Sequence, residues 1–236
     1  TDRSAEIAKS FDHRLRYYCT VDTTPLGAAR NLAIKKTKGK YIAFLDCDDI
    51  YLTEKLEKQV QLMEGGSYAM CYGSAIIINE QGQVLKKAPV KNQSGYLFGS
   101  LLKHYEINMQ SVMLRRSILI QERLSFTTHM KYCPDYDLFM GIASRYSVGV
   151  MQEFIAKYRV QEDSLSKMTV NVTSTEVRYT FDNIVERAPE LRQEFAEEFE
   201  YAYNKLHYYD AVAFICNNDS IKARSKIWSV IETKIE

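Results

Sequence analysis

The stretch KYIAFLDCDDIYLTEKL, residues 40–56, joins a short apolar run to a dense acidic cluster. Residues 41–45 have the apolar character of a buried strand, and Asp46, Asp48 and Asp49 follow at once. Like charges at this spacing repel one another, and removal from water raises their free energy further. We therefore expect something positive to be held beside this cluster.

Strands and helices alternate on both sides of this stretch. Before it, the pattern predicts a helix at 4–11, a strand at 14–21 and a helix at 28–39. After it, we expect a helix with Thr53 as N-cap and Leu56, Val60 and Met63 on one face. Further strands are predicted within 67–85, around a turn at 79–83, and at 108–116 and 149–160, with a helix at 135–146. The alternation is typical of an α/β domain with a mixed sheet and flanking helices.

The composition changes near Lys167, and from there the pattern is helical. We place a boundary at about residue 168, between a domain at 1–168 and a helical C-terminal extension at 169–236. Apolar residues recur along one face of this extension at helical spacing: Phe195, Phe199, Ala202 and Leu206. We expect that face to pack on the domain. The alternative is peripheral docking on a membrane through exposed aromatic and basic side chains: Tyr208, Tyr209, Arg224, Lys226 and Trp228.

Composition excludes several classes of protein. The 236 residues carry 31 basic and 30 acidic side chains, a net charge of +1, so we expect no nucleic-acid partner. Five scattered cysteines without a CxxC pair argue against a disulfide framework or a structural zinc site, and they favour a cytoplasmic location. The sequence has no apolar run of the roughly 20 residues that cross a bilayer, so any membrane contact is expected at the inner face.

The acidic cluster is a candidate metal site. Ligands of open α/β sheets bind beyond the carboxyl ends of the strands, where Asp46 and Asp48 fall. Carboxylate oxygens are the ligands that Mg²⁺ or Mn²⁺ prefers, commonly one or two from the protein with phosphates completing the shell. A divalent ion and a diphosphate would explain the charge. The alternative is a solvated acidic turn that caps the next helix.

Two segments resemble glycosyltransferase family 2. PLGAARNLAIKKTKGKYIAFLDCDDIYLTEKLEKQV, residues 25–60, is similar to the central segment of that family, and PDYDLFMGIASRYSVGVMQEFIAKYRVQEDSLS, residues 134–166, is similar to its acceptor-side segment. Their order strengthens the resemblance, which spans about residues 1–168. It implies a GT-A fold, a nucleoside-diphosphate sugar as donor, most readily a UDP-sugar, and a glycan or lipid-linked acceptor.

The resemblance also implies roles for single residues. Asp46 is expected near the donor ribose and sugar, with Asp48 as the metal ligand of the D-x-D motif and Asp46 beside it. Gly27, Arg30 and Asn31 match the donor-side segment before the strand; the alternative for Arg30 is an exposed helix arginine. Arg159 and Ser164 are candidate donor contacts.

Asp135 matches the aspartate of the family's ED motif, which implies a general base for an inverting transfer. Asp137 is the second candidate for this base, although it is also placed to cap a helix start. The sequence departs from the family pattern at Pro134, where Glu is usual, and at Gln161, where many relatives carry His. These departures favour a catalytically inactive scaffold or regulatory subunit as the alternative. A nucleotidyltransferase fits the acceptor-side segment poorly.

The N-terminus resembles the end of another family signature. Thr1 and Asp2 match the last residues of DDGSTD, so the strands that usually precede that signature are expected to be missing from this chain. A sheet without them would leave an edge unpaired, which invites an oligomer or a partner chain.

Overall fold

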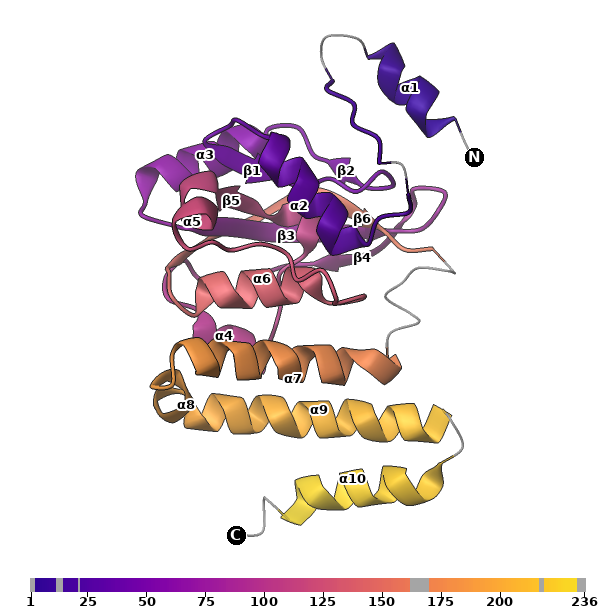
Figure 1. Cartoon of the computed structure of the whole chain (residues 1–236), viewed down its shortest axis with the longest axis vertical. Helices are drawn as coiled ribbons and strands as arrows, with labels where there is room; N and C mark the ends of the chain where they lie inside the picture. The colour runs from indigo at the N-terminus through magenta and orange to yellow at the C-terminus, as the bar shows by residue number, and fades with distance from the viewer. Residues whose placement is uncertain (1–2, 12–14, 21, 162–169, 217–218, 233–236) are drawn as a thin grey trace.

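The computed structural model describes residues 3–11, 15–20, 22–161, 170–216 and 219–232. Helices α1 to α10 span Ser4–Ser10, Leu26–Lys36, Lys55–Gly65, Phe98–Lys103, Arg116–Gln121, Pro134–Ala143, Val170–Arg187, Leu191–Glu194, Ala196–Cys216 and Ser220–Glu232. A 3-10 turn, η2, spans Met109–Ser111. Strands β1 to β6 span Tyr41–Ala43, Ile50–Tyr51, Met70–Ile78, Val84–Ala88, Met113–Arg115 and Val148–Arg159. The predicted α/β fold with a helical C-terminal part is confirmed (Figure 1).

The sheet is mixed, as predicted. Its strand order is β1-β5-β3-β6-β2, and β4 forms a hairpin with β3 through the predicted turn. Strands β3 and β6 are parallel, from Met70 beside Val148 to Ile78 beside Arg159, and the other pairs are antiparallel. Gly82, with φ +82°, supplies the left-handed conformation that the hairpin turn requires. The carboxyl end of β6 is thereby fixed next to the β3–β4 hairpin.

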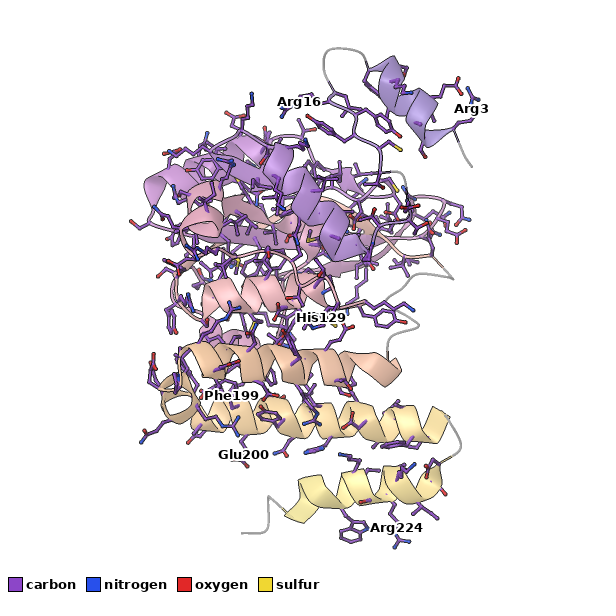
Figure 2. All side chains as sticks on the ribbon, viewed as in Figure 1. Arg3, Arg16, His129, Phe199, Glu200 and Arg224 are labelled. Carbon is purple, nitrogen blue, oxygen red and sulfur yellow. The ribbon has the colours of Figure 1, made fainter. Side chains whose placement is uncertain are left out.

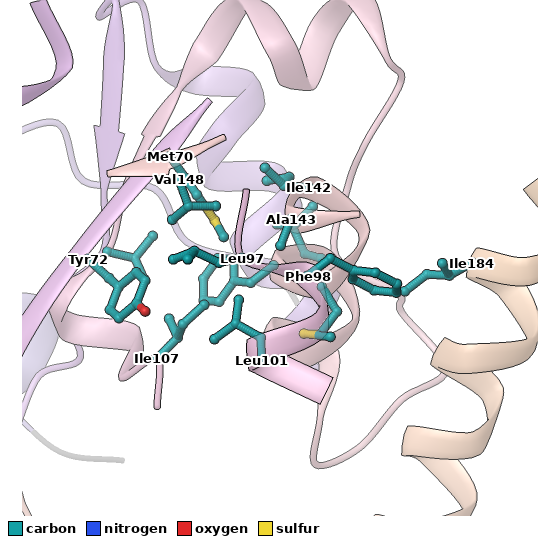
Figure 3. Close-up of a cluster of buried hydrophobic side chains, with 14 of the residues drawn as sticks. Met70, Tyr72, Leu97, Phe98, Leu101, Ile107, Ile142, Ala143, Val148 and Ile184 are labelled. Atoms are coloured by element: carbon teal, nitrogen blue, oxygen red, sulfur yellow. The ribbon is translucent and has the colours of Figure 1, made fainter. Parts of the chain in front are cut away.

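The helices beneath the sheet form successive layers. Helix α6 lies between the sheet and α7, and α9 and then α10 follow (Figure 1). Side chains from these layers share one core. Met70 of β3 and Val148 of β6 pack with Phe98 of α4 and Ile142 of α6, and Ile184 of α7 extends the cluster (Figure 3). Each such side chain gains roughly 1.5–3 kcal/mol from full burial.

The helical extension belongs to the same core. Phe199, Ala202 and Leu206 of α9 are buried, as the apolar spacing predicts, and Phe199 contacts Phe98 edge-on with ring centroids 5.8 Å apart. Figure 2 shows Phe199 on the side of α9 that faces α7, and Glu200 on the opposite side. The expected packing of this face on the domain is therefore observed. The boundary at residue 168 lies outside the described residues and stays a prediction.

The predicted strand at 14–21 is wrong for residues 15–20, which form no strand and are exposed. Tyr17 and Tyr18 instead lie under the ammonium groups of Lys9 and Lys36. Apolar alternation alone does not make a strand without a neighbour, and among the described residues β1 pairs with β5 only. Thr1 and Asp2 lie outside the described residues, and an oligomer or partner chain at this edge stays a prediction.

The start and the buried face of α3 also differ from the prediction. Glu54, with φ +70°, precedes the helix as its N-cap in place of Thr53. The buried side chains are Lys55, Gln59 and Met63, whereas Leu56 is 48% exposed. The polar pair is tolerated because the two side chains bond each other and their surroundings: Lys55 Nζ donates to Gln59 Oε1 at 2.6 Å, and Gln59 Nε2 donates to the Ser111 carbonyl at 2.8 Å.

Candidate active site

The three carboxylates after β1 lie in the loop between β1 and β2. Two of them, Asp46 and Asp49, have protein partners, and these partners differ. Asp46 faces Arg30 of α2, whose Nη2 lies 3.2 Å from both carboxylate oxygens. Arg30 is only 12% exposed, and its guanidinium lies 5.6 Å from the ring centroid of Phe126. Arg30 is therefore not an exposed helix arginine, and it supplies the expected positive charge beside the cluster.

Asp49 is buried against the end of β6. Its Oδ1 accepts the backbone N–H of Arg159 at 2.7 Å, and its Oδ2 accepts a hydrogen bond from the Gln110 side chain. Burial raises the pKa of Asp49 to about 6, while the Arg159 N–H opposes this shift and the nearby charge of Asp48 adds to it. Asp49 thus joins the acidic loop to β6 and to the turn η2.

Arg159 holds the backbone of the same region. Its Nε donates to the Asp48 carbonyl at 2.8 Å, and its Nη1 donates to the carbonyls of Asn79 and Glu80 at 2.8 and 2.7 Å. The side chain thereby ties the acidic loop to the β3–β4 hairpin. The structure places Arg159 at the predicted site as a residue that positions Asp48, and donor contact by its guanidinium stays a prediction.

The carboxylate of Asp48 is different from its neighbours. Within the part of the chain that is described, it accepts no hydrogen bond and forms no ion pair, while its backbone is fixed through Arg159. The described residues contain no group of three or more His, Cys, Asp or Glu side chains arranged to hold a metal ion. One or two carboxylates suffice for Mg²⁺ or Mn²⁺ when a diphosphate supplies further oxygens. The open carboxylate of Asp48 is chemically suited to such an ion, whereas both oxygens of Asp46 lie 3.2 Å from Arg30 Nη2, and a role for Asp46 as the second ligand stays a prediction.

Gly27 and Asn31 fix α2 against the loop that precedes α6. The Asn31 side chain pairs with the backbone of Phe126, donating to its carbonyl and accepting its N–H, both at 2.8 Å. A Cβ on Gly27 would lie 2.9 Å from the Thr127 carbonyl oxygen, so this close approach requires glycine. Both residues therefore hold Arg30 in place over Phe126, and their direct contact with a donor stays a prediction.

Asp135 stands at the first turn of α6, half-buried. Burial raises the pKa of its carboxyl group, while the Arg30 guanidinium opposes this shift and Asp46 adds to it. The charges of the Arg30–Asp46 pair therefore reach Asp135. A carboxylate with a raised pKa is a better proton acceptor, which suits the predicted base.

Asp137 has a structural environment. It is buried, and its two oxygens accept hydrogen bonds from the hydroxyls of Thr127 at 2.5 Å and Thr180 of α7 at 3.0 Å. These bonds join the loop before α6 to the helical extension. Among the described residues, no hydroxyl group donates a hydrogen bond to the carboxylate of Asp135, the other candidate base.

Sequence reasoning missed three residues that position this site. Glu176 of α7 accepts the backbone N–H groups of Lys131, Tyr132 and Cys133 at 2.7, 3.0 and 2.7 Å, directly before α6. Gln110 and Phe126 contact Asp49 and Arg30 from other segments. No periodic pattern marks these residues, because their partners are distant in sequence. Ser164 lies outside the described residues.

The segment that contains α2 and the acidic loop matches a known protein family. Residues 1–121 of the 236 match the model for glycosyl transferase family 2. The chain belongs to glycosyl transferase family 2. An uncharacterized glycosyltransferase of Rickettsia bellii is 34% identical over 160 residues, which cover 68% of this chain and 23% of that protein. The family 2 chain thus spans about a quarter of that relative's length.

The names of two other similar proteins mention a UDP-sugar. A protein of Escherichia coli named UDP-Glc:alpha-D-GlcNAc-diphosphoundecaprenol beta-1,3-glucosyltransferase WfgD is 32% identical over 164 residues, 68% of this chain and 62% of that protein. The crystal structure of S. aureus TarS 1–349 in complex with UDP-GlcNAc has a TM-score of 0.59 at 13% identity, over 99% of this chain and 80% of that one. The fold is that of GT-A-type glycosyltransferases.

Two further expectations concern the environment of the chain. Among the described residues, Cys19, Cys47 and Cys71 are free thiols. Among the described helices, none combines the length and the apolar character needed to span a membrane.

Proposed function

We propose that this family 2 chain transfers a sugar from a nucleoside-diphosphate donor to a hydroxyl group of a glycan or lipid-linked acceptor. The observation that carries the proposal is the arrangement of the acidic loop, in which Asp46 and Asp49 are bound by the protein and Asp48 is left open. UDP-sugars are the first donors to test, because UDP-GlcNAc is bound in the similar TarS structure and UDP-Glc appears in the name of the E. coli relative.

Asp135 is the proposed base. In an inverting transfer, Asp135 takes the proton of the acceptor hydroxyl while that oxygen forms a bond to the anomeric carbon and the bond from this carbon to the nucleoside diphosphate breaks. Burial raises the pKa of Asp135 and so favours proton uptake. Arg30 of α2, whose guanidinium lies over the Phe126 ring and beside Asp46, supplies positive charge on the donor side.

Asp48, with Asp46 beside it, would hold Mg²⁺ or Mn²⁺. When bound, such an ion neutralises the charge that develops on a departing diphosphate. Arg159 contributes by fixing the Asp48 backbone, and Gln110 contributes by fixing Asp49. The loop is thereby held ready for a ligand that brings its own phosphate oxygens.

The rival proposal is a catalytically inactive subunit that scaffolds or regulates a partner. Pro134 supports it, because this buried residue occupies the helix position where the family usually has Glu. Gln161 supports it as well, since an exposed amide replaces the usual His. Detectable transfer or hydrolysis of a nucleotide sugar would exclude this rival.

The test is hydrolysis of UDP-glucose and UDP-N-acetylglucosamine in the presence of Mn²⁺, together with a titration of UDP. We expect Asp135→Asn to lower kcat by about 10²–10⁴-fold, because the base is lost, and to leave the Kd for UDP unchanged. Asp182→Asn, an exposed carboxylate on α7, is the control and should keep both values. Equal rates for Asp135→Asn and the wild type would remove Asp135 as the base.

A further inference from the structure

A polar cavity of about 110 Å³ lies where three segments meet: the chain after α5, one side of α6, and α7. Four charged side chains line it: Arg123, Asp137, Arg145 and Arg187. Three positive charges against one negative charge leave a formal charge of +2 on this wall. Both oxygens of Asp137 already accept hydrogen bonds from the hydroxyls of Thr127 and Thr180, so the wall presents mainly guanidinium groups.

Several donor groups in this cavity have no partner within the described part of the chain. The guanidinium groups of Arg123 and Arg187 form neither an ion pair nor a hydrogen bond there. The Ser125 hydroxyl and the Asn183 amide form no side-chain hydrogen bond there either. Arg145 is partly neutralised, because its Nη1 lies 2.8 Å from a carboxylate oxygen of Glu122. The cavity thus gathers positive charge and free donors, which is the chemistry of an oxyanion site.

Arg123 holds a backbone conformation that glycine adopts at lower cost. Its φ is +52°, and its N–H donates to the Ile120 carbonyl at 3.3 Å. The next N–H, of Leu124, donates to the Leu119 carbonyl at 2.9 Å. This turn commonly ends a helix, and its left-handed position is usually glycine. Residues strained in this way cluster at ligand sites, so the Arg123 side chain is kept at a cost that the turn alone does not require.

Compensation of helix ends is the simplest other use of these arginines. Arg123, Arg145 and Arg187 lie at or just beyond the C-terminal ends of α5, α6 and α7. A cation there interacts favourably with the free carbonyl groups. That use explains each charge separately. It does not explain why the three side chains line one cavity together with a free hydroxyl and a free amide.

We propose that this cavity binds a phosphate group. Its volume exceeds the about 10–15 Å³ that one water requires and is below the about 300–1,000 Å³ of drug-sized ligand sites, so it suits a small oxyanion or the phosphate end of a larger molecule. Arginine forms paired hydrogen bonds with phosphate oxygens, and Ser125 and Asn183 supply further donors. The site uses neither Asp48 nor Asp135, so the inference goes beyond the proposed sugar transfer and does not depend on it.

The experiment is calorimetric titration of inorganic phosphate and of glycerol 3-phosphate into the full chain at low salt, repeated with excess UDP. We expect a Kd of about 1 mM or tighter for at least one probe. Arg187→Met and Arg123→Gly should each weaken it about tenfold or more, because a charged donor is lost. Arg123→Gly should melt at or above the wild-type temperature, since glycine relieves the strained turn. Arg224→Met, which removes an exposed arginine of α10, is the matched control (Figure 2).

The two probes separate the sources of the phosphate group. Equal or tighter binding of glycerol 3-phosphate supports a phosphate ester as the ligand, and weaker binding supports free phosphate. Absence of binding by both probes would overturn the site and leave the arginines as helix-end charges. Phosphate binding that excess UDP abolishes and that Arg187→Met and Arg123→Gly leave unchanged would place the phosphate at the donor site, which also overturns the inference. If Arg187→Met fails to fold in a thermal melt, Arg123→Gly decides the question.

Discussion

At the scale of single residues, Lys55 is buried directly behind the acidic loop. Its Nζ bonds Gln59 and lies 4.0 Å from the centroid of the Tyr51 ring, and the Tyr51 hydroxyl donates to the Phe44 carbonyl at 2.5 Å. Burial lowers the pKa of Lys55 to about 8. The lysine therefore supports the loop backbone through Tyr51 while it remains costly to charge.

This burial predicts a pH dependence of stability. The pKa of Lys55 is about 8 in the folded chain and 10.5 ordinarily, so the unfolded chain binds more protons between these values and stability rises with pH there. We expect the free energy of unfolding of the wild type, relative to Lys55→Met, to rise by about 3 kcal/mol between pH 7 and pH 10.5. Urea denaturation at several pH values measures it. A difference that does not vary with pH contradicts the burial of this charge.

The sequence predicted the position of the acidic loop but not how its charges are held. Acidic residues after an apolar run demand compensation, and this inference needs no structure. Arg30 as the partner of Asp46, and the Arg159 N–H as the partner of Asp49, depend on which loops meet in space. The burial of Lys55 and Gln59 was not predicted either, because helical spacing favoured Leu56 and Val60 as the buried side chains.

At the scale of elements, α7 and α6 are joined around the proposed base. Glu176 accepts three consecutive N–H groups at residues 131–133, and Thr180 bonds Asp137. The start of a helix leaves N–H groups without partners inside the helix, and a carboxylate there also favours the helix dipole. The helical extension thus sets the position of Asp135.

Replacement of Glu176 should disturb both stability and activity. In Glu176→Ala the N–H groups of residues 131–133 lose their acceptor, so we expect unfolding free energy to fall by about 3 kcal/mol. Hydrolysis of the UDP-sugar should fall at least tenfold, with UDP affinity kept. Urea denaturation and the hydrolysis assay measure these effects, and Glu186→Ala, an exposed position on the same helix, is the control. Unchanged hydrolysis in Glu176→Ala would mean that α7 does not position the base.

Elements with strong patterns were predictable, and elements that depend on a distant partner were not. The hairpin of β3 and β4 was predicted from its strands and turn, α6 from the segment 135–146, and α9 from its apolar spacing. The strand expected at 14–21 was not found at residues 15–20, because a strand requires a neighbour that local sequence does not specify.

At the scale of the whole molecule, the C-terminal helices complete the core instead of forming a separate one. Phe181 of α7 and Phe199 of α9 are buried in one cluster with Phe98 of α4. Among the described residues of α10, Ala223 is the buried apolar side chain. The core cluster therefore crosses the predicted boundary at residue 168.

This shared core predicts the effect of truncation. A chain that ends at residue 168 exposes the core surface around Phe98, and we expect it to lose its cooperative thermal transition. A chain that ends at residue 218 lacks α10 only, and it should keep that transition. Circular dichroism melts compare the two. A cooperative melt of the shorter chain would show that residues 3–161 fold by themselves.

The measurement that tests the proposed donor site most directly is calorimetric titration of UDP into the purified chain, with and without Mn²⁺. We predict that Mn²⁺ tightens UDP binding at least tenfold in the wild type and has no such effect in Asp48→Asn, because Asp48 holds the carboxylate left open by the protein. UDP binding that ignores Mn²⁺, or an Asp48→Asn variant that responds to Mn²⁺ like the wild type, would contradict this site.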